Sequence, residues 1–529
     1  MKALRNVVIA IFVFFLAVLI WLSLRTVGVM DYHTYDETIT LGTRNLKVDI
    51  PLALGILALA AVVCKGLTAA GRKLRNDTRA TVGFLVICSV FTAVFAYLWQ
   101  QKNIFEPMAD QAIIWYVASV TAGKLQGDVA PYAVYLIRCS NQWSVIVAMR
   151  YIIKVLGADP ATSIRIVNIG ADILTMWGLC GIAWQRSRNR RAVVITALFY
   201  TLFAPPLIYT SLVYGTSLFI CFTVLAFWAL CMFYDKSRYG NESKSKFVWL
   251  ALVLVFNAAA YMVYMGSLIG TAAIFCSLAA FTIGSRKYFR NALIVGVVSM
   301  TLLVSSVFAV RAFSDYKFKA LTGIEEKNVI PQSAWLLMGI TAEGDDCSFG
   351  PGSHNYLPFH MYDANDGDTG ATAREVRAEL RKAVHEYISG ERDKTFFITK
   401  TRYQWCDPWW GSLAMTMYPQ NMWDEMTDEY RQWLDGPLIH AMYEISACLM
   451  LIVYITAFSG GLADLFAKRA KMEVEYHIPE IYFIGGFIFQ FFWESKSRYC
   501  MPYFLIIIPL AAVIVARTMG RYVLRDSVG

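Results

Sequence analysis

Two carboxylates follow directly after an apolar stretch that is long enough to cross a membrane. The segment 105–111 reads FEPMADQ, so Glu106 and Asp110 are expected at the water-facing surface of a bilayer. A base at this depth meets a lipid-linked substrate and a water-side acceptor together. Asp is also a common helix N-cap, and the spacing alone favours this capping role for Asp110 over a catalytic one.

A charged island lies between two late apolar stretches, where the segment 493–499 reads WESKSRY. Ionisable residues in such a place need a partner or a wet cavity. Arg498 offers a fork of N–H donors that suits a phosphate, and Lys496 supplies a second cation. Glu494 and Arg498 are four residues apart and would pair on a continuous helix. Phosphate binding and a local ion pair therefore explain the island equally well.

Amide and aromatic side chains mark two further candidate segments. Asn141 and Gln142 precede an amphipathic stretch and suit hydroxyl-rich ligands, although Asn at a helix start is equally well explained as a cap. Tyr214, next to Gly215, marks a tight turn after a stretch that the pair Pro205-Pro206 should kink. Neither segment defines a site by itself.

A patch of aromatic and charged residues lies in the later polar region. It comprises Lys400, Trp405, Asp407, Trp409 and Trp410. Such a patch stacks on a sugar ring in some proteins, but a small hydrophobic core has the same composition, and we favour the core. The same region holds Cys347 and Cys406, which would form a disulfide if that face is oxidising. The absence of any CxxC pair gives metal or redox chemistry little support.

The elements that position these residues are transmembrane helices. Apolar residues make up 57% of the chain and charged residues only 16%, and solid apolar runs recur from end to end. Because strand-like alternation is missing, the sequence predicts an all-α polytopic membrane protein with about 12 spans. The expected spans are 5–24, 49–71, 82–100, 163–185, 192–211, 214–234, 247–263, 265–284, 290–312, 441–466, 479–493 and 500–518.

The positive charges orient these spans. Lys and Arg gather at seven places, all of which fall on one side, the cytoplasm by the positive-inside rule. They are residues 2–5, 72–79, 186–191, 236–246, 286–290, 468–471 and 521–525. Because Arg150 and Lys154 lie on one face of 142–157, we place this segment in the membrane interface as an amphipathic helix, together with 111–124. Without a small-residue cleavage site, the first 24 residues are read as a signal anchor.

Two long loops are left on the outer side. The first, 101–162, belongs to an N-terminal transmembrane region 1–312. The second, 313–440, is expected to form a small mixed extracytoplasmic cap with a helix over 371–390, and 441–529 is the C-terminal transmembrane region. Since the basic residues cluster in short loops without interleaved aromatics, a nucleic-acid partner is not expected; the lipid bilayer is.

The order of these motifs resembles that of the GT-C superfamily, polytopic glycosyltransferases that use polyprenyl-phosphate-linked sugars. The topology, the acidic residue of the first large outer loop, the two interfacial helices and the late turn from Glu494 to Tyr499 carry this resemblance. The segments PMADQ (107–111), SNQ (140–142), YG (214–215), WLLMG (335–339) and QWCDP (404–408) are similar to those of a bacterial branch that acts on cell-surface glycans.

The resemblance implies an inverting transfer in which a lipid phosphate leaves as an acceptor hydroxyl attacks. On this template Asp110 is the general base, and Arg498 stabilises the leaving phosphate with help from Lys496. Glu106 is a second candidate catalytic residue and would also line the donor or acceptor sugar. The side chains expected to line the sugars are Gln111, Asn141, Gln142, Tyr214, Glu494 and Tyr499.

Three features of this assignment stay open at the level of sequence. Asp110 is followed by Gln111 and not by a second acid, and one carboxylate holds Mg²⁺ or Mn²⁺ poorly, so metal dependence is undecided. Transfer of a hexose and transfer of a pentose are both compatible with these motifs. The alternative class is a polytopic transporter or a flippase for lipid-linked glycans, although its polar residues usually lie near mid-membrane in repeated halves.

Overall fold

A computed structural model describes residues 2–30, 39–103, 107–239, 245–284, 292–325, 328–341, 350–416, 427–467 and 473–525. Within these ranges, nine helices are long and apolar enough to cross a membrane, and two bent helix pairs raise the number to eleven. A further apolar helix, α21 (Ile478–Phe492), is shorter than these candidates, so nine to eleven spans stand against the twelve expected. The prediction of an all-α polytopic membrane protein is therefore confirmed.

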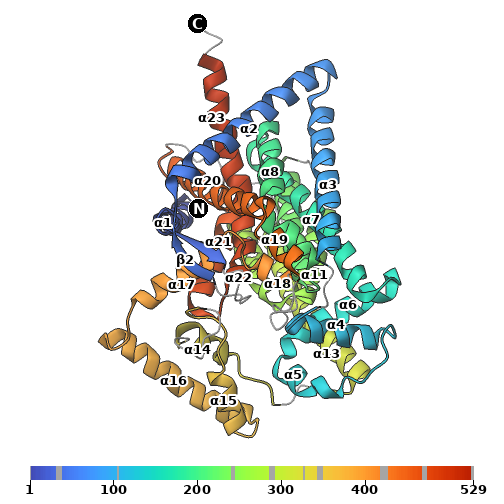
Figure 1. The fold of residues 1–529 in the computed structure, drawn as a ribbon. Coiled ribbons are helices and arrows are strands. Elements are labelled where there is room, and N and C mark those ends of the chain that lie inside the picture. The colour runs from blue at the N-terminus through green and yellow to red at the C-terminus, as the bar shows by residue number, and fades with distance from the viewer. Residues whose placement is uncertain are drawn as a thin grey trace.

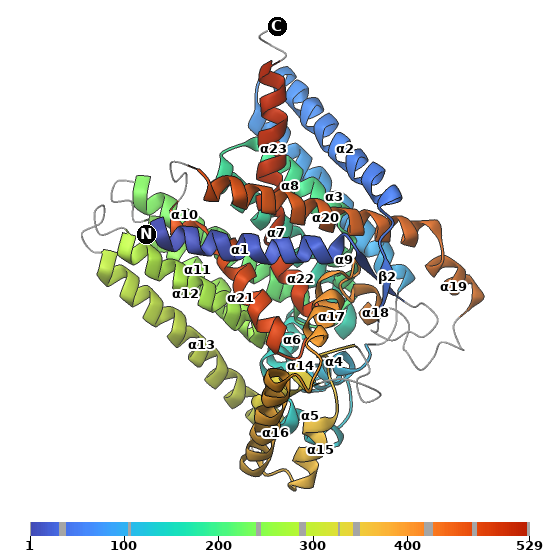
Figure 2. The same ribbon diagram turned by 90° about the vertical axis from the view of Figure 1, so that its left-hand side faces the viewer.

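Each expected span coincides with one of these helices. The straight ones are α1 (Lys2–Ser23), α2 (Leu46–Lys73), α3 (Asp77–Lys102), α7 (Pro160–Ser187), α10 (Thr216–Tyr239), α11 (Ser245–Val263), α12 (Leu268–Gly284), α13 (Ala292–Thr322) and α20 (Pro437–Leu465). Figure 2 shows α10, α11, α12 and α13 as a row of neighbouring helices, with α1 and α20 running side by side.

Two expected spans are broken by proline. The pair α8 (Arg190–Leu202) and α9 (Ala204–Ile208) is bent by 59°, and α22 (Ser497–Leu505) and α23 (Ile508–Arg525) are bent by 43°. Pro205 and Pro206 occupy the first turn of α9, and Pro509 occupies the first turn of α23, directly after the break at 506–507. Pro502 lies inside α22, which continues past it to Leu505. Because proline has no backbone N–H, it interrupts the helical hydrogen bonds at these points.

The first long loop, which the sequence predicts to be on the outer side, folds as two packed helices joined by short turns. These are α4 (Asp110–Thr121) and α6 (Trp143–Leu156), with α5 (Ala133–Arg138) between them. Arg150 Nε donates a hydrogen bond to the carbonyl oxygen of Thr121 at 2.9 Å, which joins the end of α4 to α6. α13 continues ten residues beyond its expected end at 312. In this extension Phe318 stacks on Trp143 of α6, with ring centroids 4.5 Å apart.

The described residues of the second outer loop are helical as well. Its helices are α14 (Ser333–Thr341), α15 (Leu357–Ala364), α16 (Thr369–Ser389), α17 (Thr395–Trp405), α18 (Ser412–Thr416) and α19 (Asp428–Leu434). Figure 1 shows α14, α15 and α16 at the same end of the molecule as α4, α5 and α6, away from the C-terminus. We call residues 328–341 and 350–416 the cap.

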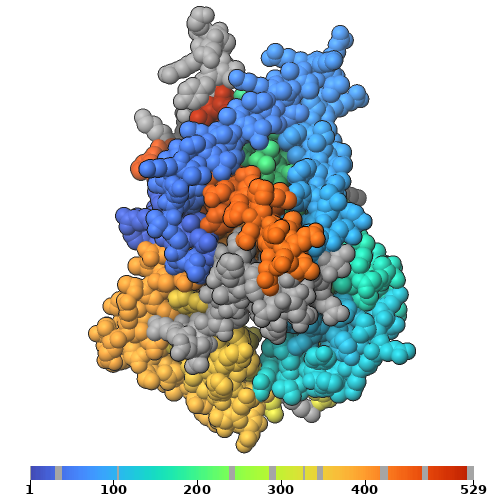
Figure 3. Space-filling model, in the orientation of Figure 1, coloured from blue at the N-terminus to red at the C-terminus, as the bar shows by residue number. Residues whose placement is uncertain are grey.

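The cap and the first outer loop face each other across a hollow, which Figure 3 shows between the yellow α15 region and the cyan α4 to α6 region. An ion pair between Arg138 on α5 and Asp363 on α15 spans the two parts, and the Arg138 guanidinium lies 5.3 Å from the centre of the Tyr362 ring. These two contacts connect the loops that flank the hollow.

A short hairpin that the sequence did not predict joins α1 to α2. Its antiparallel strands are β1 (Thr26–Met30) and β2 (Ile39–Thr43). The Gly28 N–H donates to the carbonyl oxygen of Cys406 at 2.7 Å, and a Cβ on Gly28 would come within 3.0 Å of Asp407 Cα. Glycine therefore permits the hairpin to lie directly against the end of α17.

Candidate functional site

Asp110 occupies the first turn of α4 and does not cap it. The residue at the N-cap position is Ala109, whose φ of 49° is a conformation that residues with a Cβ rarely adopt. The half-buried Asp110 side chain instead accepts a hydrogen bond from Tyr135 Oη to its Oδ1 at 2.8 Å. The favoured capping role is therefore wrong, and the carboxylate lies within the loop.

The negative charge of Asp110 shifts the pKa values of three neighbouring side chains. Burial, followed by the negative charge of Asp110, raises the pKa of Tyr135 well above its ordinary value, so Tyr135 stays a neutral donor. The same two causes raise the pKa of Cys139 to about 12, which Arg138 opposes. For Tyr214, burial and Asp110 raise the pKa while Arg498 lowers it. Tyr214 therefore lies within electrostatic reach of both the carboxylate and the guanidinium.

The side-chain amide of Gln111 forms hydrogen bonds to the backbone of two other segments. Its Nε2 donates to the carbonyl oxygen of Met415 at 3.0 Å, and its Oε1 accepts from the Val213 N–H at 3.1 Å. The side chain is buried. Because both ends of the amide are used in this way, Gln111 fixes the start of α4 against α18 and the 212–215 turn, and this position suits a supporting residue better than a sugar contact.

Gln142 and Tyr214 form a polar pair at the edge of the same region. Tyr214 Oη donates to Gln142 Oε1 at 2.9 Å. Gly215 follows directly, and a Cβ there would approach the Val263 carbonyl oxygen to 2.1 Å, so this turn requires glycine. Asn141 is exposed beside Gln142. The two residues predicted from the SNQ and YG segments are thus in direct contact.

Arg498 lies on the first turn of α22 and is held by two neighbours. Its Nη1 approaches Met415 Sδ at 3.0 Å, and its Nη2 donates to Tyr499 Oη at 2.9 Å. Glu494 precedes α22, and its N–H donates to the Trp335 carbonyl oxygen at 2.8 Å. Glu494 and Arg498 therefore do not share the continuous helix that their spacing allowed.

Lys496 and Arg498 line one small pocket. Gly411, Ser495, Ser497 and Tyr403 contribute to its wall, with Pro351 of the cap and Ile39 of β2. Two cations in one pocket beside a membrane-spanning helix suit a phosphate group. Since Met415 contacts both Arg498 and Gln111, a continuous chain of contacts joins this pocket to the residue next to Asp110.

Asp407 holds the start of α22 in place. Its fully buried carboxylate accepts hydrogen bonds from Ser497 Oγ at 2.7 Å, from the Gly411 N–H at 2.8 Å and from the Trp409 N–H at 2.9 Å. Burial raises the pKa of Asp407, and the bond from Ser497 lowers it. Ser497 immediately precedes Arg498, so Asp407 positions the guanidinium through the backbone.

Lys400 joins the cap to the end of α21. Its buried Nζ donates to the carbonyl oxygens of Gly339 at 2.7 Å, Phe491 at 3.0 Å and Trp493 at 2.7 Å. Burial lowers the pKa of Lys400 to about 7, while the negative charge of Glu494 raises it. The aromatic members of the same patch, Trp405, Trp409 and Trp410, are fully buried, which confirms the favoured core interpretation.

Two predicted features lie outside the described residues. Glu106 is one, so its relation to Asp110 stays a prediction. Cys347 is the other, so the disulfide to Cys406 stays a prediction too; the buried Cys406 Sγ lies 3.6 Å from Ser23 Oγ. Among the described side chains, no three His, Cys, Asp or Glu residues gather as a metal site, and the dependence on Mg²⁺ or Mn²⁺ stays open.

Sequence reasoning missed the residues that support the site. Tyr135 and Asp110 are separated by a loop whose fold sets their contact, so no spacing rule relates them. Met415 contributes a backbone carbonyl and a thioether, neither of which is a recognisable catalytic group. The one usable signal was the presence of two charged residues, Lys400 and Asp407, in an otherwise aromatic segment. Because buried charges need partners, these residues could have been predicted to bind other parts of the chain.

No protein-family model matches the chain, and no curated protein matches its sequence. The fold is similar to that of archaeal oligosaccharyltransferase AglB from Archaeoglobus fulgidus in complex with an inhibitory peptide and a dolichol-phosphate, at 11% identity and a TM-score of 0.40, over 85% of this chain and 51% of that one. The apo form of the Archaeoglobus fulgidus oligosaccharyltransferase gives 11% identity and a TM-score of 0.41, over 85% and 52%. The chain spans about half the length of these proteins.

Proposed function

We propose that this chain is a membrane glycosyltransferase that moves a sugar from a polyprenyl-phosphate donor to a cell-surface glycan or a lipid-linked acceptor. The observation that carries the proposal is the arrangement of Asp110, Lys496 and Arg498. A half-buried carboxylate and a pocket with two cations lie at the end of the helix bundle where both outer loops gather, linked by Met415. These are the groups that proton removal and phosphate departure require.

In the proposed reaction the acceptor hydroxyl oxygen attacks the anomeric carbon from the face opposite the phosphate. The new C–O bond forms as the bond to the phosphate oxygen breaks, which inverts the configuration. Asp110 takes the hydroxyl proton; Tyr135 holds its Oδ1, and Oδ2 is the oxygen assigned to the acceptor. Arg498 and Lys496 stabilise the charge that develops on the polyprenyl phosphate.

The remaining predicted residues are assigned to the sugars. Gln142 and Tyr214, already in contact, provide an amide and a hydroxyl beside Asp110, and Asn141 adds an exposed amide. Tyr499 Oη accepts a hydrogen bond from Arg498 Nη2, so we assign Tyr499 to the sugar next to the phosphate that Arg498 binds. Glu494 and Glu106 complete the proposed sugar contacts, and the donor sugar is a hexose or a pentose.

The proposed location is the extracytoplasmic side of a bacterial cytoplasmic membrane, supported by the bias of Lys and Arg toward the opposite loops. The alternative is a transporter or flippase for lipid-linked glycans. Such a protein moves the donor without cleaving it, whereas a transferase releases free polyprenyl phosphate. The product therefore separates the two classes.

The test is incubation of the purified protein with a panel of synthetic polyprenyl-phosphate hexoses and pentoses, together with candidate glycan acceptors. Wild-type protein should release free polyprenyl phosphate from one donor. Arg498→Gln should lower this rate by about 100-fold to 1,000-fold, because a group that stabilises the transition-state charge is lost. Arg377→Gln, an exposed change on α16, is the matched control and should retain full activity. Transbilayer movement of an intact donor, with no release, would contradict the proposal.

A further inference from the structure

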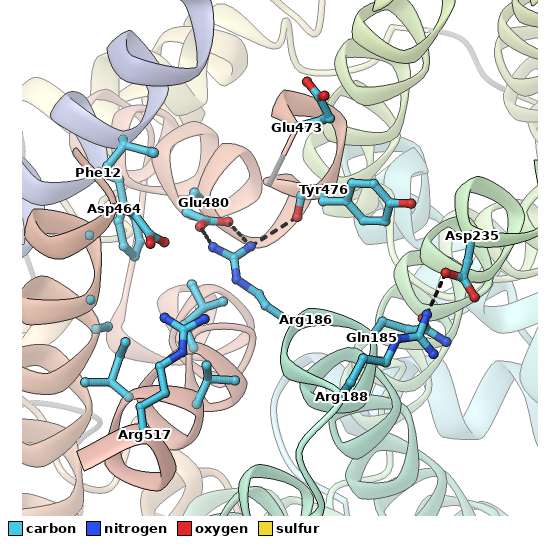
Figure 4. Close-up of a pocket in the computed structure, with 17 residues that line it drawn as sticks. Phe12, Gln185, Arg186, Arg188, Asp235, Asp464, Glu473, Tyr476, Glu480 and Arg517 are labelled. Carbon is cyan, nitrogen blue, oxygen red and sulfur yellow. Dashed lines mark hydrogen bonds and ion pairs between the residues drawn. The ribbon is translucent and has the colours of Figure 1, made fainter. Parts of the chain in front are cut away.

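A second polar cavity lies at the other end of the helix bundle. Its volume is about 340 Å³, and its walls come from α1, α7, α10, α20, α21 and α23 (Figure 4). Arg186 stands at the last turn of α7 and Asp464 at the last turn of α20, next to loops that carry the clustered positive charges. The positive-inside rule thus places this cavity at the level of the cytoplasmic lipid head groups.

Two ion pairs are built into the wall of this cavity. Arg186 pairs with Glu480, which also accepts from the buried His477 ring at 2.8 Å, and Arg186 Nη1 donates to the Tyr476 carbonyl oxygen at 3.1 Å. Arg188 pairs with Asp235 at 2.5 Å. These four charged side chains neutralise one another in pairs and fix the positions of α7, α10 and α21.

The other charged side chains of the wall are left without ion pairs among the described residues. They are Arg517 on α23, Asp464 on α20 and Glu473 before α21. Figure 4 shows the Arg517 guanidinium and the Asp464 carboxylate extending from facing helices toward the same space. Both side chains are half-buried, where an unpaired charge is costly. The wall therefore offers one cation and two carboxylates to a ligand.

This combination selects a ligand that carries both charges. A simple anion would pair with Arg517 but would be repelled by Asp464 and Glu473. A simple cation would leave Arg517 unpaired. A zwitterion with a phosphate near a primary ammonium satisfies both groups, since a guanidinium binds phosphate in a fork and a carboxylate accepts ammonium N–H bonds.

We propose that the cavity binds a phosphoethanolamine group, with Arg517 on the phosphate and Asp464 on the ammonium. The group is the head of phosphatidylethanolamine or its soluble counterpart. Ile9 and Phe12 of α1, with Leu510 and Val513 of α23, form the apolar part of the wall. Basic pockets between transmembrane helices at this level bind anionic lipid head groups, and the carboxylates of this wall would favour a zwitterionic one instead. The site is independent of the proposed transfer reaction.

The test is a competition for lipids by the full-length protein in detergent. The protein is incubated with equal amounts of phosphatidylethanolamine, phosphatidylglycerol and phosphatidylcholine of identical acyl chains, and bound lipids are counted by native mass spectrometry. Phosphatidylglycerol lacks the ammonium, and phosphatidylcholine has an ammonium without N–H donors. Phosphatidylethanolamine should be retained about tenfold more than either.

Variants assign the preference to the two residues. Arg517→Gln and Asp464→Asn should each abolish it, while Arg517→Lys, which keeps the charge, should retain most of it. Arg72→Gln, an exposed change on the same side of the membrane, is the matched control and should have no effect. Displacement of the lipid by soluble phosphoethanolamine would show that the head group suffices; resistance to it would assign binding to the lipid. Equal retention of the three lipids, or an unchanged preference in both charge-removing variants, would overturn the proposal.

Discussion

Removal of the Ser497 hydroxyl should weaken both the stability and the turnover of the protein. Ser497 Oγ donates to the buried carboxylate of Asp407 at 2.7 Å. A hydrogen bond to a charged group contributes about 1.5–3 kcal/mol. Asp407 keeps its bonds from the Trp409 and Gly411 N–H groups, so Ser497→Ala should lower the free energy of unfolding by about this amount without unfolding the cap. Because Arg498 follows directly, turnover should fall by about tenfold or more.

The assay combines chemical unfolding in detergent, followed by tryptophan fluorescence, with release of polyprenyl phosphate. The buried Trp409 and Trp410 flank this bond and report its environment. Ser389→Ala, at an exposed position at the end of α16, is the matched control and should change stability by less than about 0.5 kcal/mol. If Ser497→Ala behaves like that control in both measurements, Asp407 does not position Arg498 and the reasoning is refuted.

Three further changes test other contacts. Tyr135→Phe should lower kcat about tenfold with little change in KM, because the Asp110 carboxylate loses the hydrogen bond from Tyr135 Oη that orients it. Steady-state kinetics check this, and an unchanged kcat would show that Tyr135 does not orient the base. Cys139, whose pKa burial and Asp110 raise to about 12, should react slowly with maleimide at pH 8. Asp110→Asn should speed the reaction, since loss of the negative charge lowers the thiol pKa and increases the thiolate fraction; an unchanged rate would contradict the electrostatic link. Lys400→Met should lower the free energy of unfolding by about 2–4 kcal/mol, because three carbonyl oxygens lose their hydrogen-bond donor. An unfolding temperature equal to that of the wild type would show that Lys400 does not stabilise the contact between the cap and α21.

The helices could be predicted from sequence because the membrane restricts what a span can be. A run of about 20 apolar residues has to be helical, and each predicted stretch falls on a helix or, for 192–211 and 500–518, on a bent pair of helices. The charge of Arg150 was the reason to predict an interfacial helix and not a span for 142–157; the structure forms the 14-residue helix α6 there, and Arg150 Nε donates to the Thr121 carbonyl oxygen. The 26–43 hairpin was missed, because its stability depends on contact between Gly28 and Cys406, 378 residues later in the chain.

The candidate site was predictable only in part. Asp110, Lys496 and Arg498 could be predicted as site residues because they are charged and lie beside apolar spans, where charges are costly. Their supports were not predictable, because contacts such as Gln111 to Met415 and Ser497 to Asp407 join distant parts of the chain. A local Glu494–Arg498 ion pair was one of two equally weighted interpretations of this segment, and it assumed one continuous helix; in the structure α21 ends at Phe492 and α22 begins at Ser497.

The most direct test of the central claim is the rate of polyprenyl-phosphate release by Asp110→Asn, measured beside Asp128→Asn. Both changes replace a carboxylate by an amide in the same outer loop, and Asp128 is exposed at a turn. If Asp110 is the general base, its variant should lose about 100-fold to 10,000-fold in turnover while it stays folded and Asp128→Asn stays active. Full activity of Asp110→Asn would contradict the account and move the search for the base to Glu106.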